Sequence, residues 1–310
     1  MSVRVGTCSW ADDSLSKLWY PPGVSSAEAR LRWYADHFDT VEVNSSYYAL
    51  PTAEMATAWA QRTPPGFVFH VKAFGMMTRH PVKVEQLPPD LRSQAVFDQR
   101  GRVEHPSQEL RAEVFRRFLQ AVAPLREAGK LGGILMQLPP YIVAKPESLA
   151  YLEWAREQLG DAEMLVEFRH RSWLTGEQRD RTLEFLRQLP ASYVMVDAPD
   201  MAGNNVAPTV IARTSDTAYL RLHGRNKATW NRRGGSASER FDHLYTRAEL
   251  SEWVEPLREL AAEPGNVWAM FNNNGRSNDA AGRPFAQAPA NAAEMVELLQ
   301  LAGVPVAAAR

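Results

Sequence analysis

Eight short apolar segments alternate with helical patterns along the 310-residue chain, and this alternation restricts the possible folds more than any other feature. Each segment is rich in Val, Ile, Leu, Phe or Tyr, as expected for strands buried on both faces. The predicted strands are Val3–Thr7, Thr40–Asn44, Phe67–Lys72, Gly133–Leu138, Met164–Arg169, Tyr193–Asp197, Ala218–His223 and Val267–Asn272. Alternation of strands and helices requires parallel pairing with crossovers, and eight strands favour closure. The sequence therefore predicts an eight-stranded parallel (β/α)8 TIM barrel.

Two connections depart from this regular pattern. Residues 198–217 contain two prolines and a glycine and show no convincing helix. The long insertion Ala73–Ser107 follows the third strand and holds four prolines. A loop of this length inside a compact domain is often a lid or a binding loop. Because no linker, repeat or low-complexity segment interrupts the pattern, residues 1–310 are expected to form a single domain.

The overall charge gives little attraction to nucleic acid or to a membrane surface. The chain has 35 basic and 36 acidic residues and a net charge of −1, so only a local basic patch could bind a polyanion. No run of about 18 apolar residues and no secretory signal is found, and we expect a cytoplasmic protein. Since Cys8 is the single cysteine, an internal disulfide and a cysteine-based zinc site are both excluded.

Several predicted strands end in polar residues spaced two apart, with apolar residues between them. The second strand ends Val41-Glu42-Val43-Asn44, and the fifth ends Val166-Glu167-Phe168-Arg169. The third strand carries His70 and Lys72 in the same way, the seventh carries Arg221 and His223, and the fourth, sixth and eighth end near Gln137, Asp197 and Asn272. Alternate residues of a strand face opposite sides. The polar members should therefore point into the barrel near its C-terminal mouth, where barrel enzymes carry their active sites.

Six of these inward residues are charged. Glu42, Glu167 and Asp197 face Lys72, Arg169 and Arg221 in a balance of three against three. One interpretation is a self-neutralising structural network, because a buried charge is costly unless it is paired. The other is a functional site, because such a network adds little net stability and lies where substrates enter. Both interpretations stay open at this point.

The loops above the strand ends resemble a binding surface. Trp173 follows the fifth strand, and Arg225, Trp230, Arg232 and Arg233 follow the seventh. Loops after strands seven and eight of such barrels often bind phosphate, and an interleaved Trp suits stacking on a base or a sugar. A solvated basic loop with no ligand is the alternative.

A series of motifs in this chain resembles the YecE-like family, also known as domain of unknown function 72. The motifs span nearly the whole chain in family order: Gly6-Thr7-Cys8-Ser9-Trp10, Trp19-Tyr20-Pro21, Thr40-Val41-Glu42-Val43-Asn44, Tyr47-Tyr48-Ala49-Leu50-Pro51, Phe67-x-Phe69-x-x-Lys72, Gln137-Leu138-Pro139-Pro140, Glu167-Phe168-Arg169-His170-x-Ser172-Trp173, Arg221-x-His223-Gly224 and Phe271-Asn272-Asn273. The resemblance implies a β/α barrel and marks the mouth residues as characteristic of the family. It implies no particular reaction. The segment Asn274–Ala286 is longer than the short turn expected there.

The first functional hypothesis is an enzyme, an isomerase or a hydrolase, that acts by acid–base chemistry on a small anionic or sugar-like, phosphorylated substrate. Glu167 or Asp197 would be the general base, and Lys72 or His223 the general acid. Forked guanidinium donors suit a phosphate or carboxylate. The predicted substrate-binding residues are Glu42, Asn44, Gln137, Arg169, Arg221, Arg225, Trp10, Trp173 and Asn272. No cofactor is required by this hypothesis.

Three alternatives remain. A divalent metal such as Mn or Mg could be held by Glu42, Glu167, Asp197 and His223, although the neighbouring cations already neutralise the acids. The protein could instead bind or cleave nucleic acid through the basic loop, which a strongly salt-dependent affinity would support. It could also be a non-catalytic barrel that binds a ligand.

Overall fold

The strands close into one barrel, which confirms the predicted fold class. The computed structural model describes residues 1–201, 203, 206–230 and 240–307. The eight parallel strands follow chain order around the barrel, and β1 pairs with β8 to close it. Their bounds are β1 Val3–Thr7, β2 Thr40–Val43, β3 Val68–Lys72, β4 Leu131–Gln137, β5 Met164–Glu167, β6 Ser192–Asp197, β7 Thr217–Leu222 and β8 Asn266–Phe271. Each predicted strand is therefore present, with its ends shifted by two residues at most.

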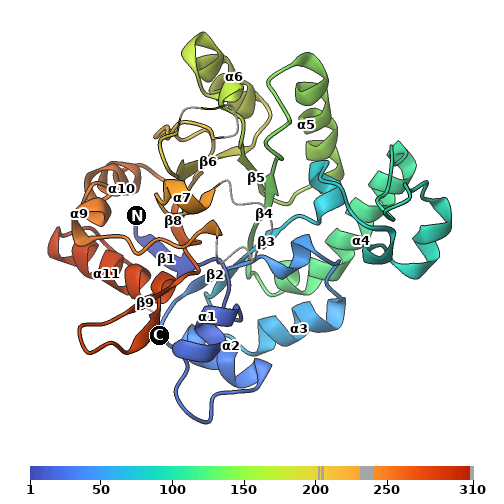
Figure 1. Cartoon of the computed structure of the whole chain (residues 1–310). Coiled ribbons are helices and arrows are strands. Elements are labelled where there is room, and N and C mark those ends of the chain that lie inside the picture. Colours follow the sequence, from blue (N-terminus) through green and yellow to red (C-terminus); the bar gives the residue numbers. More distant parts are fainter. Residues whose placement is uncertain (202, 204–205, 231–239, 308–310) are drawn as a thin grey trace.

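Helices surround the strands on the outside, as Figure 1 shows. They are α1 Asp13–Leu18, α2 Ala27–Ala35, α3 Ala53–Gln61, α4 Gln108–Glu127, α5 Pro146–Leu159, α6 Gly176–Gln188, α7 Lys227–Trp230, α9 Arg247–Ser251, α10 Val254–Ala262 and α11 Gln287–Leu301. Side-chain oxygens of Ser26 and Thr52 cap α2 and α3, because each accepts a hydrogen bond from a backbone amide of the first turn. No helix in the part of the chain that the structure describes is long and apolar enough to cross a membrane.

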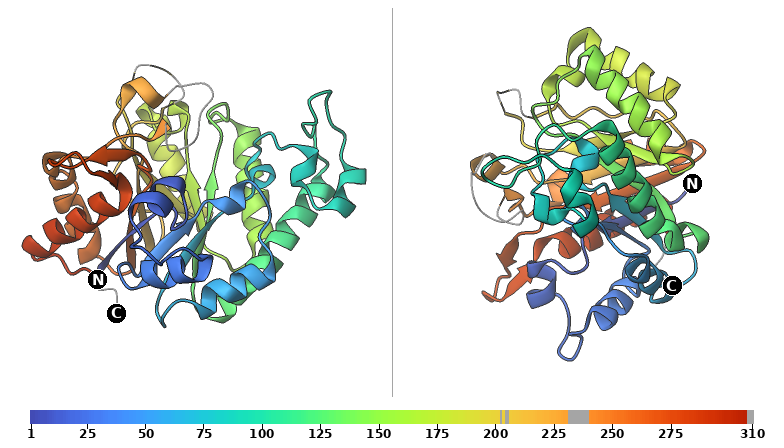
Figure 2. Two further views of the ribbon diagram at one scale, coloured as in Figure 1. Left: turned by 60° about the horizontal axis from the view of Figure 1, so that its bottom comes forward. Right: turned by 90° about the vertical axis from the view of Figure 1, so that its right-hand side faces the viewer.

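The long connections take three different forms. In the insertion Ala73–Ser107, three short 3₁₀ helices form, at Gly75–Thr78, Val84–Gln86 and Pro89–Gln94. Arg117 of α4 holds this insertion through Asp90 at 2.5 Å, and Figure 2 shows the segment standing out from the barrel beside α4. The described residues of 198–217 contain no helix, as predicted. The segment after β8 folds into an antiparallel hairpin, β9 Arg276–Asn278 and β10 Pro284–Ala286, which the sequence did not reveal.

Two apolar layers hold the barrel together. A large outer layer packs the helices against the strands. A smaller layer fills the barrel itself and consists of Cys8, Leu135, Leu165, Val194, Val196, Tyr219, Trp268 and Met270. Within this interior His70 lies between the rings of Tyr219 and Trp268, with ring centroids 4.7 and 4.5 Å away. The filled interior excludes a pore, so a ligand has access to the strand ends only.

Candidate functional site

Strand register shows which side chains point into the barrel mouth. Residues paired across neighbouring parallel strands face the same side. Gln137 pairs with Glu167 across β4 and β5. Two residues earlier on the same strands, Leu135 pairs with Leu165, and both leucines lie in the barrel interior. Glu42 of β2 pairs with His70 of β3, and both side chains point into the barrel. The predicted alternation is therefore correct for strands two to five and for strand seven.

Arg221 lies at the centre of a fully buried ion cluster. Its Nε and Nη2 atoms donate to the two carboxylate oxygens of Glu42 at 3.0 and 2.6 Å, and its Nη1 donates to Glu167. The Tyr219 hydroxyl donates to Glu42 at 2.9 Å. All three charged side chains have no solvent exposure. One forked guanidinium thus joins strands β2, β5 and β7 across the barrel.

Glu167 is held by several donors. Gln137 donates to its Oε1 atom at 2.7 Å, and the His223 Nε2 atom lies 3.2 Å from the same oxygen. Burial favours the protonated acid, but Arg221, His223 and Arg169 outweigh it and hold the pKa of Glu167 well below its usual range. A carboxylate that stays ionised and fully hydrogen-bonded is a weak base, which favours an electrostatic and orienting role over the predicted general base.

His223 is neutral near pH 7, since burial lowers its pKa to about 4. A carboxylate only accepts hydrogen bonds, so the proton of the imidazole must lie on Nε2, facing Glu167. The Nδ1 atom then accepts from the side-chain amide of Asn272 at 2.8 Å. Phe241 stacks on the ring with centroids 5.0 Å apart. The imidazole is thus enclosed with both nitrogens in contact with partners, and its predicted role as general acid stays a prediction.

Lys72 differs from these residues because it lines an open cavity. Its Nζ donates to the Gln137 Oε1 atom at 2.9 Å and lies 4.6 Å from the ring centroid of Tyr47. Burial, together with the Arg221 guanidinium, lowers the pKa of Lys72 to about 8. An amine with this pKa can exchange a proton near physiological pH.

Arg169 is a second cation near the mouth, beside Glu167, but it does not line the cavity that Lys72 lines. Its guanidinium lies over the Trp230 ring at 5.0 Å and approaches Glu167 to 3.8 Å, beyond hydrogen-bonding distance. Its side chain is only 14% exposed. Among the residues that the structure describes, none accepts a hydrogen bond from this guanidinium. Within the described ranges, the five N–H donors of this almost buried guanidinium thus have no acceptor, and an anionic ligand could use them.

A cavity of about 330 Å³ opens at the mouth. Its wall includes the predicted residues Trp10, Glu42, Asn44, Lys72 and Asn272. Trp10 is 9% exposed and packs edge-on against Trp59 at 5.7 Å, so it supports the wall as much as it lines it. The mouth therefore combines an open volume with the ion cluster beneath it.

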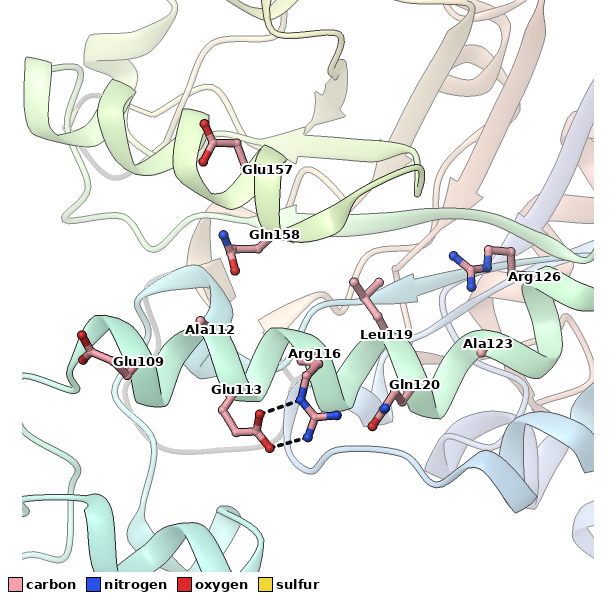
Figure 3. A pocket seen from close by; sticks show the side chains of 10 residues that line it. All are labelled: Glu109, Ala112, Glu113, Arg116, Leu119, Gln120, Ala123, Arg126, Glu157 and Gln158. Atoms are coloured by element: carbon pink, nitrogen blue, oxygen red, sulfur yellow. Dashed lines mark hydrogen bonds and ion pairs between the residues drawn. The ribbon is translucent and has the colours of Figure 1, made fainter.

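A larger, more open groove of about 590 Å³ lies on the outer surface between α4 and α5, as Figure 3 shows. Glu113 and Arg116 pair there at 2.5 Å, and the pair is solvent-exposed. The groove contains none of the predicted site residues, and its charges are ordinary surface charges. We therefore place the functional site at the mouth.

The structure does not bring Asp197 into the cluster. Asp197 accepts from Arg225 at 2.6 Å, from the Tyr245 hydroxyl at 2.8 Å and from the Trp253 indole at 2.6 Å. Its neighbour Val196 pairs with Arg221 and faces the interior, so Asp197 faces the helices. The strand Ser192–Asp197 is apolar apart from its ends, so its sequence contains no alternation from which the inward side could be read.

Five of the predicted binding residues do not line the mouth cavity: Gln137, Arg169 and Arg221 lie in or beside the ion cluster, and Arg225 and Trp173 lie elsewhere. Arg225 is taken up by Asp197 and by Glu252, the latter at 2.8 Å. Trp173 is completely buried, stacks on Phe168 at 4.4 Å and donates to a backbone carbonyl. Arg232 and Arg233 lie outside the described residues.

The metal alternative does not fit this geometry. Both oxygens of Glu42 already accept hydrogen bonds from Arg221, and Asp197 is separated from Glu42, Glu167 and His223 by its own partners. Within the described ranges, no three His, Cys, Asp or Glu side chains are arranged to hold a metal ion. The donor set proposed from the sequence is therefore not assembled.

Sequence reasoning missed several residues of the mouth. Tyr47 packs on Lys72, and His80 from the long insertion meets the Tyr47 ring at 5.1 Å. Burial lowers the pKa of His80 to about 3, and Lys72 adds to this effect. Asp12 and Asn274 line the cavity from the loops after β1 and β8. No spacing in the sequence connects these loop residues with the strand ends, so only the motif around Tyr47 could have indicated one of them.

Comparisons with known proteins agree on one family. Residues 4–309 match the family model described as "Protein of unknown function DUF72". The chain is 33% identical to the UPF0759 protein YunF of Bacillus subtilis (strain 168) over 304 residues, which cover 96% of this chain and 95% of YunF.

Two crystal structures of DUF72 family proteins share the fold. The Thermotoga maritima MSB8 protein is 28% identical, with a TM-score of 0.74 and coverage of 97% of this chain and 100% of its own. The Enterococcus faecalis V583 protein is 25% identical, with a TM-score of 0.75 and coverage of 96% and 95%. The match over almost the whole chain, together with the barrel and its mouth residues, shows that this chain belongs to the DUF72 family.

Proposed function

We propose that this protein is an enzyme that performs acid–base chemistry on a small anionic or sugar-like substrate, such as a phosphorylated one, at the barrel mouth. The observation that carries the proposal is a pair of cations beside the ion cluster, Lys72 and Arg169, that the carboxylates of the cluster do not saturate. Lys72, Arg169 and Arg221 outnumber the carboxylates of Glu42 and Glu167. The third predicted acid, Asp197, is neutralised elsewhere by Arg225.

Each residue of the cluster has a distinct part in this proposal. Arg221 is saturated by the two carboxylates, which leaves Arg169 and Lys72 to attract an anion. Arg169 would hold a phosphate or carboxylate group by its free donors. Lys72 would donate or remove the proton, because it lines the cavity and its pKa lies near 8. Glu167 and His223 would keep Gln137 and Arg221 in position rather than react.

The test is binding of matched anionic and neutral small molecules, followed by calorimetry at low and moderate salt. Inorganic phosphate, glucose 6-phosphate and glucose would be compared on the wild type and on Arg169→Ala. We expect the phosphorylated compounds to bind at least tenfold more tightly than glucose, and Arg169→Ala to remove that difference, by about 1.4 kcal/mol or more. The surface variant Arg179→Ala is the matched control and should bind like the wild type. Equal binding of glucose and glucose 6-phosphate would overturn the proposal.

Acid–base chemistry is tested separately through Lys72. Selective acetylation followed by mass spectrometry should show Lys72 titrating near pH 8, well below the ordinary pKa of a lysine in water, about 10.4. Arg169→Met should move the titration of Lys72 to higher pH, because it removes a neighbouring positive charge. A Lys72 that titrates with the surface lysines would contradict its assignment as the proton-transfer residue.

The nucleic-acid alternative gains no support from the described residues. Arg225, the first cation of the loop after β7, is bound to Asp197 and Glu252. A non-catalytic binding protein would show the same anion preference as the enzyme but no turnover of any bound ligand.

A further inference from the structure

Three buried side-chain oxygens around the mouth cavity have no hydrogen-bond donor. They are the Oδ2 atom of Asp12 and the Oδ1 atoms of Asn44 and Asn274, and within the described part of the chain no group donates to them. All three residues line the cavity that Lys72 lines. Asn274 is 7% exposed, so solvent around the protein does not satisfy it. A buried acceptor without a donor costs about 1–3 kcal/mol.

The other polar atom of Asp12 and of Asn44 already has partners, which keeps the unpaired oxygens of these two residues in place. The other oxygen of Asp12 caps α1 by accepting from the amides of Ser14 and Leu15 at 2.9 and 3.0 Å. The amide nitrogen of Asn44 donates to the Cys8 carbonyl at 2.8 Å. These hydrogen bonds fix the two side chains, so their unpaired oxygens cannot simply rotate toward another donor.

The acceptors and the cations occupy different sectors of the mouth. Asp12, Asn44 and Asn274 follow β1, β2 and β8, which are neighbours in the barrel, whereas Lys72 and Arg169 belong to β3 and the end of β5. A ligand that satisfies both sectors needs hydrogen-bond donors at one end and negative charge at the other. A simple anion such as inorganic phosphate offers too few donors for the first sector.

We propose that the natural ligand is a polyhydroxylated anion, whose hydroxyl groups donate to Asp12, Asn44 and Asn274 while its phosphate or carboxylate binds Lys72 and Arg169. This inference rests on the proposed function, which identifies the anionic group of the ligand, and it adds the chemical nature of the rest of the same ligand. Hydroxyl groups are suitable because each supplies one donor and is uncharged. Asp12 is an acid, so this wall is a better match for uncharged hydroxyl groups than for a second anion.

The experiment measures affinity along a series that keeps the phosphate and varies the hydroxyl groups: ethyl phosphate, glycerol 1-phosphate, ribose 5-phosphate and glucose 6-phosphate. We expect affinity to rise with hydroxyl content, by about five- to tenfold for each acceptor satisfied. Asn274→Leu is similar in size and removes one acceptor. Asp12→Ser removes another but keeps a residue that caps helices well. Both variants should lose the gain from hydroxyl groups while binding ethyl phosphate like the wild type.

The possible failures are distinguishable. Equal affinity for ethyl phosphate and glucose 6-phosphate would overturn this inference and leave the proposed anion site intact. An unchanged hydroxyl preference in both folded variants, checked by circular dichroism, would also overturn it. If no phosphate compound binds but uncharged glycerol or ribose does, with an affinity that depends on Asn274, the proposed function is wrong. The binding of hydroxyl groups by Asp12, Asn44 and Asn274 would then be supported.

Discussion

At the scale of single residues, Arg221 determines whether the mouth can exist at all. Its guanidinium is the shared charged partner of two buried carboxylates, and it makes the hydrogen-bonded ion pair with each of them. Leaving a buried charge without its partner costs far more than the net stability of the intact pair. The residue is thus indispensable even if the cluster as a whole adds little stability.

Replacing Arg221 should therefore lower the stability of the protein strongly. Removing the two negative charges that Arg221 balances should restore most of that stability. We expect Arg221→Met to lower the free energy of unfolding by about 3–5 kcal/mol, measured by urea denaturation. The triple variant Arg221→Met, Glu42→Gln, Glu167→Gln should recover most of this loss. The control Arg225→Met breaks a pair that is partly solvent-exposed and should cost less. A loss under about 1 kcal/mol for Arg221→Met would show that water reaches the carboxylates.

At the scale of elements, the sequence was informative where polar and apolar residues alternate. The ends of β2, β3, β5 and β7 alternate, and their polar residues do face inward, with His70 deep in the barrel and Glu42, Glu167 and Arg221 nearer the mouth. The strand before Asp197 does not alternate, and its acid was assigned to the wrong side of the sheet. The alternation of polar and apolar residues shows which side of a strand faces the barrel interior only if the two sides differ in polarity. Loop residues such as Asp12 and Asn274 follow no regular alternation, so their direction cannot be predicted in this way. The fold was therefore predictable, and the cavity wall was not.

The contact between β1 and β2 depends on one glycine. A Cβ atom on Gly6 would lie 2.4 Å from the backbone oxygen of Thr40, and backbone cannot give way as a flexible side chain can. We expect Gly6→Ala to lower the thermal midpoint strongly, with a cost of about 1–3 kcal/mol or more. Gly133→Ala is the matched strand control, since its nearest contact is a Leu165 side-chain carbon at 3.1 Å. Similar midpoints for the two variants would contradict the idea that β1 and β2 touch through backbone.

At the scale of the whole molecule, three enclosed histidines make stability depend on pH. Burial lowers the pKa of His70 to about 3, that of His80 to about 3 and that of His223 to about 4, against an ordinary value of 6.5. Both ring nitrogens of His70 lack a partner in the described structure, and Arg4 is the nearby charge. Proton binding therefore favours the unfolded chain between these values and 6.5.

The sign of the effect follows from this difference. At these three histidines the unfolded chain binds more protons between about pH 3 and pH 6.5, so their contribution to the free energy of unfolding should rise with pH in this window and level off above it. Asp39, whose pKa burial raises to about 6, contributes with the opposite sign and offsets part of the rise. Thermal unfolding at a series of pH values measures the slope. His70→Phe keeps an aromatic ring between Tyr219 and Trp268 but cannot take up a proton, so it should flatten the slope. A wild-type curve without slope below pH 6.5 would contradict the buried, neutral state of these histidines.

The shared ion cluster also has a consequence for the order of assembly. Arg221 lies 179 residues from Glu42 and 54 from Glu167 along the chain, so both acids are synthesised long before their common counter-ion. Contacts between such distant segments form after local ones, because closing long loops costs chain entropy first. Until β7 joins the sheet, a partly formed barrel contains Glu42 and Glu167 without Arg221, and burying these two carboxylates is then unfavourable. The ion cluster beneath the mouth is therefore complete only after β7 has joined the sheet, so a chain that lacks β7 should keep Glu42 and Glu167 exposed to water.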